Sequence, residues 1–170
     1  MRIIVSDSSC LIDLRKVSLL GALLRLPCEF LIPDTLFEDE QRNFTPAEKQ
    51  SLLRAGLQVI ELPGERVLRA QAVMRSRQRL SVYDGFAFVL AEQHPGSSLL
   101  AGDGELRSLA MLHQMRVHGV LWVIDELHRN NILKAKALLE ALKTLSADPA
   151  VKVAGKEISA SIKRFTNMKQ

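Results

Sequence analysis

The chain has 170 residues, a mass of 19.0 kDa and 47% apolar residues, which matches the size and composition of one globular domain. No stretch approaches the roughly 18 apolar residues of a membrane span, and the first residues lack the length of a signal peptide, so we expect a soluble, cytoplasmic protein with no membrane segment. Lys and Arg exceed Asp and Glu by 23 to 19, and the pI near 9.3 is compatible with nucleic acid binding without requiring it. The two cysteines, Cys10 and Cys28, lack the density of a disulfide scaffold and the spacing of a zinc site, so we expect buried, reduced thiols.

Short apolar runs alternate with helical patterns along most of the chain. In chain order, the patterns predict a strand at 2–6, a helix at 10–26, a strand at 29–32, a helical turn or two at 35–41, a helix at 45–56, a strand at 57–62, helices at 65–79 and 81–93, a strand at 98–101, and helices at 105–114, 135–145 and 158–165. The start at Thr45 is well marked, because a capping threonine, Pro46 and a reciprocating Glu48 follow one another. Gly56 is expected to end that helix.

Residues 119–124 fit two structures. Their Val, Trp and Ile residues favour a strand, whereas Val120, Ile124 and Leu127 also fall on one helical face, and we prefer the helix. Strands of four to six residues alternating with helices indicate a parallel or mostly parallel sheet covered on both faces. The predicted fold class is therefore α/β, without internal repeats or a linker.

Several reaction classes leave no signature in the sequence. A phosphate-binding glycine loop, a Gly-x-Ser-x-Gly elbow and a His-Glu-x-x-His pair are all missing. The four histidines show no paired spacing, and we assign them no catalytic role.

The acidic residues are more informative than the histidines. Asp7 and Asp103 each follow a short apolar strand at the point where a helix begins, and in parallel sheets such positions meet in one crevice. Carboxylates gathered there would need a hard cation such as Mg²⁺ or Mn²⁺ to offset their repulsion. A structural alternative stays open for each residue: Asp7 and Asp103 fit as helix N-caps, and Asp84 fits a capping box with Ser81.

A single site becomes a stronger interpretation when these acids are taken together. Asp7, Asp84, Asp103 and the acidic cluster 38–40 all stand at the starts or ends of predicted elements. Their common placement favours one cluster of carboxylates over four unrelated caps.

Four segments resemble the motifs of the PIN-domain ribonucleases, and within them the VapC-like toxins of bacterial and archaeal toxin–antitoxin pairs. The segments are residues 4–12, Pro33–Glu40, Ser81–Ala91 and Leu99–Ala110. The resemblance implies a three-layer α/β fold with a central, mostly parallel sheet flanked by helices. It also implies a nuclease domain at residues 1–130 with a helical extension at 131–170 packed on the same domain.

The resemblance also implies the roles of individual acids. Asp7, Asp84 and Asp103 match the family's ligands for Mg²⁺ or Mn²⁺. Counting from Pro33 places the second acid on Asp39, whereas residue type places it on Glu40, which we prefer as the catalytic residue. In such a site the metal lowers the pKa of a water that hydrolyses the phosphodiester bond.

Neighbouring polar residues are expected to support the ligands. Three residues could position the metal ligands without binding the metal themselves, or else simply stand in the first turn of a helix: Ser8, Ser9 and Glu105. One departure from the family pattern is Ala101, which stands where a Ser or Thr usually precedes the last acid. This departure raises an alternative: a catalytically inactive PIN-like module that binds RNA or a protein.

A group of arginines supplies a candidate RNA-binding surface. It consists of Arg66, Arg69, Arg75, Arg77 and Arg79. Against the single acid Glu65, the segment has a local charge of 5 − 1 = +4, although a solvated helix face explains it equally well. From the family we further expect a cognate antitoxin and a homodimer, and a DNA nuclease with the same acids stays open as a substrate alternative.

Overall fold

The computed structural model describes residues 1–40, 44–102 and 104–168. In chain order these residues form β1 (Arg2–Ser6), α1 (Ser8–Lys16), α2 (Leu20–Leu23), β2 (Cys28–Pro33), the π-helix η1 (Leu36–Glu40), α3 (Pro46–Arg54), β3 (Gln58–Ile60), α4 (Gly64–Arg75), α5 (Val82–Glu92), β4 (Ser98–Leu100), α6 (Gly104–Leu112), β5 (Arg116–His118), α7 (Val120–Arg129), α8 (Ala135–Ala147) and α9 (Gly155–Thr166).

The five strands of the described residues are all parallel, in the order β3-β2-β1-β4-β5. The central strand β1 is covered on both faces, since Ile4 and Val5 expose only 1% and 0% of their surface. Continuous apolar runs rather than alternating ones are typical of such doubly covered strands. The α/β prediction is confirmed.

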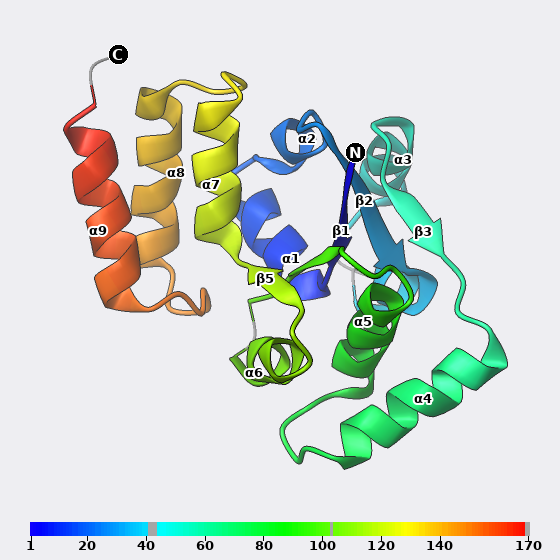
Figure 1. Ribbon diagram of the computed structural model, residues 1–170. Helices are drawn as coiled ribbons and strands as arrows, with labels where there is room; N and C mark the ends of the chain where they lie inside the picture. Colours follow the sequence, from blue (N-terminus) through cyan, green and yellow to red (C-terminus); the bar gives the residue numbers. More distant parts are fainter. Residues whose placement is uncertain (41–43, 103, 169–170) are drawn as a thin grey trace.

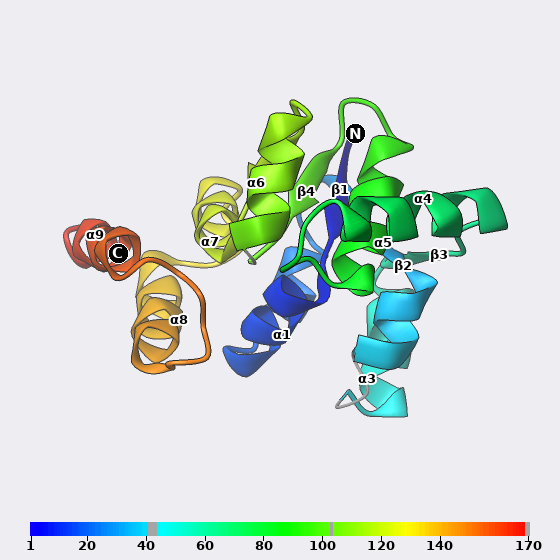
Figure 2. The ribbon, with the colours of Figure 1, turned by 90° about the horizontal axis from the view of Figure 1, so that it is seen from below.

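Helices cover the two faces of the sheet in separate layers. α1 and η1 lie on one face, whereas α5 packs against β1, β2 and β4 on the other, with α6 beside it (Figures 1 and 2). α4 packs along α5 and forms the outer edge of the molecule in Figure 1. The predicted three-layer arrangement is therefore present.

The sheet has a topological switch point between β1 and β4. The chain runs from β1 outward through β2 to β3, and then returns to add β4 and β5 on the opposite side of β1. The backbone N–H of Asp7 donates to the carbonyl of Leu100 at 2.9 Å, so the pairing continues past the end of β1. Ligands bind α/β sheets at this kind of crevice, beyond the carboxyl ends of the strands.

The single helix predicted at 10–26 is wrong, because α1 ends at Lys16 and the short α2 follows. Ser18 takes a left-handed φ of 58°, its N–H donates to Arg15, and the N–H of Leu19 donates to Leu14. These two bonds form a Schellman motif, and the buried pair Leu14 and Leu19 completes it. The leucine spacing continued past the turn, but a serine in place of the usual glycine hid the helix end.

Three other elements bear on the predictions: the end of α4, the strand β5 and the start of α7. α4 ends at Arg75 rather than at residue 79. At this end the Ser76 hydroxyl donates a hydrogen bond to the carbonyl of Val73 at 2.6 Å. The three-residue edge strand β5 was not predicted, because its polar sequence carries no apolar run. The preferred helix at 119–124 is confirmed as the start of α7.

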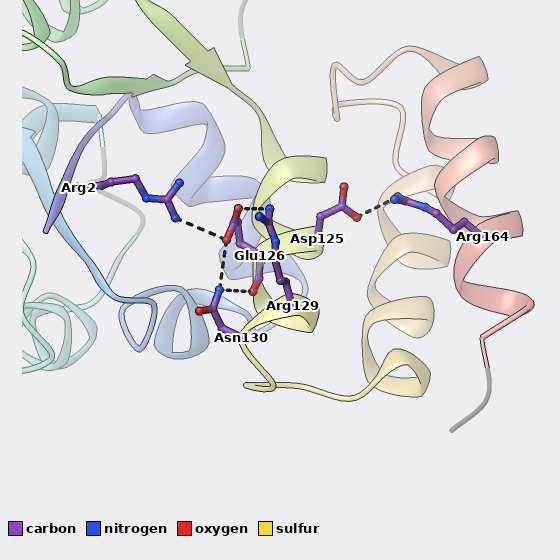
Figure 3. Close-up of polar contacts among 6 residues, drawn as sticks. All are labelled: Arg2, Asp125, Glu126, Arg129, Asn130 and Arg164. Carbon is purple, nitrogen blue, oxygen red and sulfur yellow. Dashed lines mark hydrogen bonds and ion pairs between the residues drawn. The ribbon is translucent and has the colours of Figure 1, made fainter.

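α8 and α9 lie beside α7, away from the sheet (Figure 1). Ion pairs link α7 to β1 on one side and to α9 on the other (Figure 3). Glu126 of α7 is buried and receives contacts from Arg2, Arg129 and Asn130, with the Arg2 nitrogen at 3.6 Å (Figure 3). Residues 135–166 add buried apolar side chains that include Leu142 and Phe165. The division at residue 130 stays a prediction.

Two smaller expectations concern the membrane and the cysteines. In the part of the chain that the structure describes, no helix has the length and apolar character needed to cross a bilayer. Cys10 is a buried free thiol and Cys28 a half-buried one.

Candidate active site

Asp7 lies at the carboxyl end of β1 and caps α1. Its Oδ1 accepts the Cys10 N–H at 3.0 Å, and its Oδ2 accepts the Ser9 hydroxyl at 2.8 Å and the Gly102 N–H at 3.1 Å. These three hydrogen bonds engage both oxygens of the carboxylate. The capping role predicted as the structural alternative is therefore present.

Burial dominates the electrostatics of Asp7. Only 3% of the residue is exposed, and this desolvation raises the pKa of its carboxyl to about 6. The hydrogen bonds from Cys10, Ser9 and Gly102 act in the opposite direction, while the negative charge of Asp84 raises the pKa further. The protein thus holds an acid where its ionised form is disfavoured, which is a frequent property of functional sites.

Asp84 approaches Asp7 from the first turn of α5. It forms the predicted capping box, in which Ser81 and Asp84 exchange side-chain and backbone hydrogen bonds of 3.1 Å each. Asp7 and Asp84 line one pocket of about 270 Å³, together with Ser8, Ser9, Arg79, Ser81 and Lys152. Two acids from elements far apart in sequence therefore share one cavity with two basic side chains.

Asp39, one of the two candidates for the second acid, lies near the start of α5. The Tyr83 hydroxyl donates to Asp39 Oδ2 at 3.2 Å, which brings η1 next to the residue that precedes Asp84. Glu40 ends η1, but its side chain lies outside what the structure describes. Both candidates stay predictions.

Asp103 follows β4 in sequence and also lies outside the described residues. Within residues 1–40, 44–102 and 104–168, no three His, Cys, Asp or Glu side chains gather closely enough to hold a metal ion. Of the predicted ligands, the described structure brings together Asp7 and Asp84.

Gly102 allows the close contact that holds Asp7. A Cβ at this position would lie 2.8 Å from the Ser9 hydroxyl oxygen, so any larger residue would push that hydroxyl away from Asp7. The Ser9 hydroxyl thus holds one oxygen of Asp7, and the buried Ser8 lines the same pocket; their roles beside a metal stay predictions. Glu105 instead pairs with Arg77 at 3.0 Å.

The predicted arginine group is divided among different surroundings. Arg66 and Arg69 of α4 both face Glu92, at 3.7 and 3.0 Å, while Arg75 is exposed at the end of that helix. Arg77 pairs with Glu105, and Arg79 lines the acid pocket. The local excess of positive charge is therefore partly neutralised by Glu92 and Glu105, which lie outside the arginine segment in the sequence.

Lys152 is a pocket residue that the sequence did not reveal. It stands between α8 and α9 in the segment Val151-Lys152-Val153-Ala154, which carries no motif. Only the tertiary fold brings this connecting segment to the pocket that Asp7 and Asp84 line.

Comparisons with known proteins bear on the family and the fold of the chain. The family model described as DUF3368, PIN domain, matches residues 3–165. A solved PilT N-terminus domain protein from the hyperthermophilic archaeon Sulfolobus solfataricus has a similar fold, with a TM-score of 0.53, 14% identity, and coverage of 74% of this chain and 93% of that one. No curated protein matches the chain. Since the family model spans nearly the whole sequence, the chain belongs to the PIN-domain family.

Proposed function

We propose that this PIN-domain protein is a metal-dependent endoribonuclease that hydrolyses phosphodiester bonds in RNA. PIN domains are generally nucleases, which supports the reaction class. The observation that carries the proposal is the pocket at the carboxyl end of β1, where Asp7 and Asp84 face Arg79 and Lys152. We further propose that Asp103 and either Asp39 or Glu40 complete the acidic set.

The donor chemistry of this pocket fits a hard divalent cation. Asp7 and Asp84 offer only oxygen ligands, and Mg²⁺ commonly binds through one or two carboxylates while it keeps several waters. The raised pKa of Asp7 and the repulsion from Asp84 are what a cation would relieve. When bound, Mg²⁺ or Mn²⁺ would lower the pKa of a water and stabilise charge on the phosphate.

The chain's own residues have separate tasks in this proposal. Ser9, Cys10 and Gly102 fix the Asp7 carboxylate through hydrogen bonds, so that Oδ1 is oriented before any ligand arrives. Arg79 and Lys152 offset the negative charge of the acids and attract the RNA phosphates. Arg66, Arg69, Arg75 and Arg77 contribute at longer range and less strongly, because three of them face acids.

We also propose the more specific role of a VapC-like toxin in a cytoplasmic toxin–antitoxin pair. The motif resemblance supports this role, and it adds a cognate antitoxin and a homodimer as partners. Purification with the protein encoded next to the gene, followed by a cleavage assay with and without it, tests the antitoxin; unchanged cleavage in its presence would contradict the toxin role.

Cleavage of labelled RNA by the purified protein tests the nuclease. We expect cutting in Mg²⁺ or Mn²⁺, none in EDTA, and a loss of at least about 100-fold in Asp7→Asn and Asp103→Asn. Asp125→Asn is the matched control, because this carboxylate lies on α7 and pairs with Arg164 rather than lining the pocket. Equal cleavage by wild type and Asp7→Asn would falsify the proposal.

A second candidate, an inactive RNA- or protein-binding module, rests on Ala101. This buried residue replaces the family's hydroxyl at the end of β4, where its carbonyl accepts a hydrogen bond from Arg107 at 3.0 Å. RNA binding in EDTA without cleavage in any metal would favour this module. Cleavage of DNA but not RNA would instead move the substrate to DNA.

A further inference from the structure

A second cavity, of about 320 Å³, adjoins the acid pocket. Its walls come from the carboxyl end of the sheet on one side and from residues 152–157 of the C-terminal segment on the other. Lys152 lines both cavities, and Gly102, which lines the second one, donates to Asp7 in the first. If a phosphate of an RNA strand lay at Asp7, the neighbouring nucleoside of that RNA would therefore be close enough to enter this cavity.

One wall of the cavity is aromatic and apolar. His118 at the end of β5 stacks on Trp122 of α7, with ring centroids 4.2 Å apart and an interplanar angle of 10°. Burial, with the neighbouring charge of Arg2 next in importance, lowers the pKa of His118 and so favours the neutral ring. A neutral imidazole both donates and accepts hydrogen bonds beside an apolar surface, as recognition of a planar heterocycle requires.

The charged groups of the lining balance. The lining holds two basic side chains, Arg107 and Lys152, and two acidic ones, Asp13 and Glu157. One N–H of Arg107 donates to the Ala101 carbonyl at 3.0 Å, and a Cβ at Gly119 would lie 2.9 Å from the same nitrogen. Arg107 is therefore held in place in the lining. A balanced set of donors and acceptors suits an uncharged polar group better than a free anion or cation.

We propose that this cavity binds the nucleoside next to the cleaved phosphate, with Lys152 contacting the phosphate at the junction of the two cavities. The inference rests on the proposed nuclease function. It assigns a role to the C-terminal segment, because residues 152–157 supply one wall of the nucleoside site. The volume is at the lower end of the range for small-ligand sites, which suits one nucleoside rather than an oligonucleotide.

Trp122 provides a direct probe, since it is the only tryptophan of the chain and lines the cavity. Its single indole N–H signal in a nitrogen-correlated NMR spectrum is followed while the four ribonucleoside 5′-monophosphates are added in EDTA. We expect a saturable shift with nucleotides and none with ribose 5-phosphate, which has the sugar and phosphate but no base. No saturable shift with any nucleotide up to about 10 mM, or an equal shift with ribose 5-phosphate, overturns the proposal.

Two lysines of the same segment give a matched pair of variants. Lys152→Ala should weaken nucleotide binding roughly three- to tenfold, whereas Lys156→Ala, an exposed position outside the lining, should leave it unchanged. Equal effects of the two variants also overturn the proposal. The titration needs neither metal nor cleavage, so it tests the nucleoside site separately from the nuclease. RNA cleavage without nucleotide binding would contradict only the nucleoside site. Nucleotide binding without RNA cleavage would contradict only the nuclease function.

Discussion

Asp7 combines a structural and a chemical role in one side chain. Its carboxylate caps α1, joins the end of β1 to Gly102 after β4, and faces Asp84 across the acid pocket. The local sequence predicts the cap, because an acid before a helix commonly accepts backbone N–H bonds. The contact with Gly102 and the charge of Asp84 come from segments far along the chain, so no local pattern encodes them.

The burial of Asp7 predicts a pH-dependent stability. Its pKa is raised from 3.8 to about 6 in the folded protein, so between these values the folded state binds more protons and stability falls as pH rises. Without metal, the wild type should lose roughly 2 kcal/mol relative to Asp7→Asn between pH 4 and pH 7, since each pKa unit corresponds to about 1.4 kcal/mol and part of the shift is already spent at pH 4. Urea unfolding of both proteins in EDTA checks this difference, and parallel pH curves would contradict it.

Gly102 and Ser9 predict a coupled effect on stability. Gly102→Ala should cost on the order of 1–2 kcal/mol, because the new Cβ displaces the Ser9 hydroxyl from Asp7. In a Ser9→Ala background the same change should cost less than about 0.5 kcal/mol, because the clash is gone. Chemical denaturation of the wild type, the two single variants and the double variant gives the coupling energy. Strictly additive costs would show that the contact with Ser9 is not what disfavours a larger residue at position 102.

At the scale of elements, helix starts could be predicted more reliably than helix ends. The capping boxes at Thr45 and Ser81 are complete within four residues, and both exist as predicted. The end of α1 depends on a left-handed serine, and β5 depends on pairing with β4 at residues distant in sequence. The end of α1 is a local turn that carries no glycine to mark it, whereas β5 follows from tertiary pairing, which outweighs local propensity.

The packing of α4 on α5 predicts a destabilising glycine substitution. A Cβ at Gly85 would lie 2.7 Å from the backbone oxygen of Ala70, so Gly85→Ala must push the two helices apart. We expect a cost of about 1–3 kcal/mol and weaker RNA cleavage, because Asp84 precedes this glycine. Gly64→Ala is the control, since a Cβ there meets nothing within 4 Å and should be neutral or slightly stabilising. Thermal unfolding compares the two, and equal melting temperatures would contradict the close approach.

At the scale of the whole molecule, ion pairs join β1, α7 and α9. Glu126 is 3% exposed at its side chain and contacts Arg2 and Arg129, whereas Asp125, which pairs with Arg164, is 37% exposed (Figure 3). Removal of a partner from a buried charge is costly, while an exposed pair contributes little. The two pairs should therefore differ in their contribution to stability.

Paired arginine variants test this difference. Arg129→Ala should lower the free energy of unfolding by about 2 kcal/mol, and Arg164→Ala by less than about 1 kcal/mol. The smaller effect should shrink further in high salt, because exposed charges are screened. Equilibrium unfolding at low and high salt measures both, and the reverse order of the two costs would contradict the burial argument.

The sequence by itself determined the alternation of strands and helices, the acids at the strand ends and the family resemblance. These features are local, because hydrophobic period and capping residues act within one element. The tertiary structure alone decided that Asp7 and Asp84 share a pocket, that Glu92 and Glu105 neutralise part of the arginine group, and that Lys152 reaches the acids. Burial and charge interactions depend on distance in space rather than along the chain, and they therefore appear only once the elements have packed.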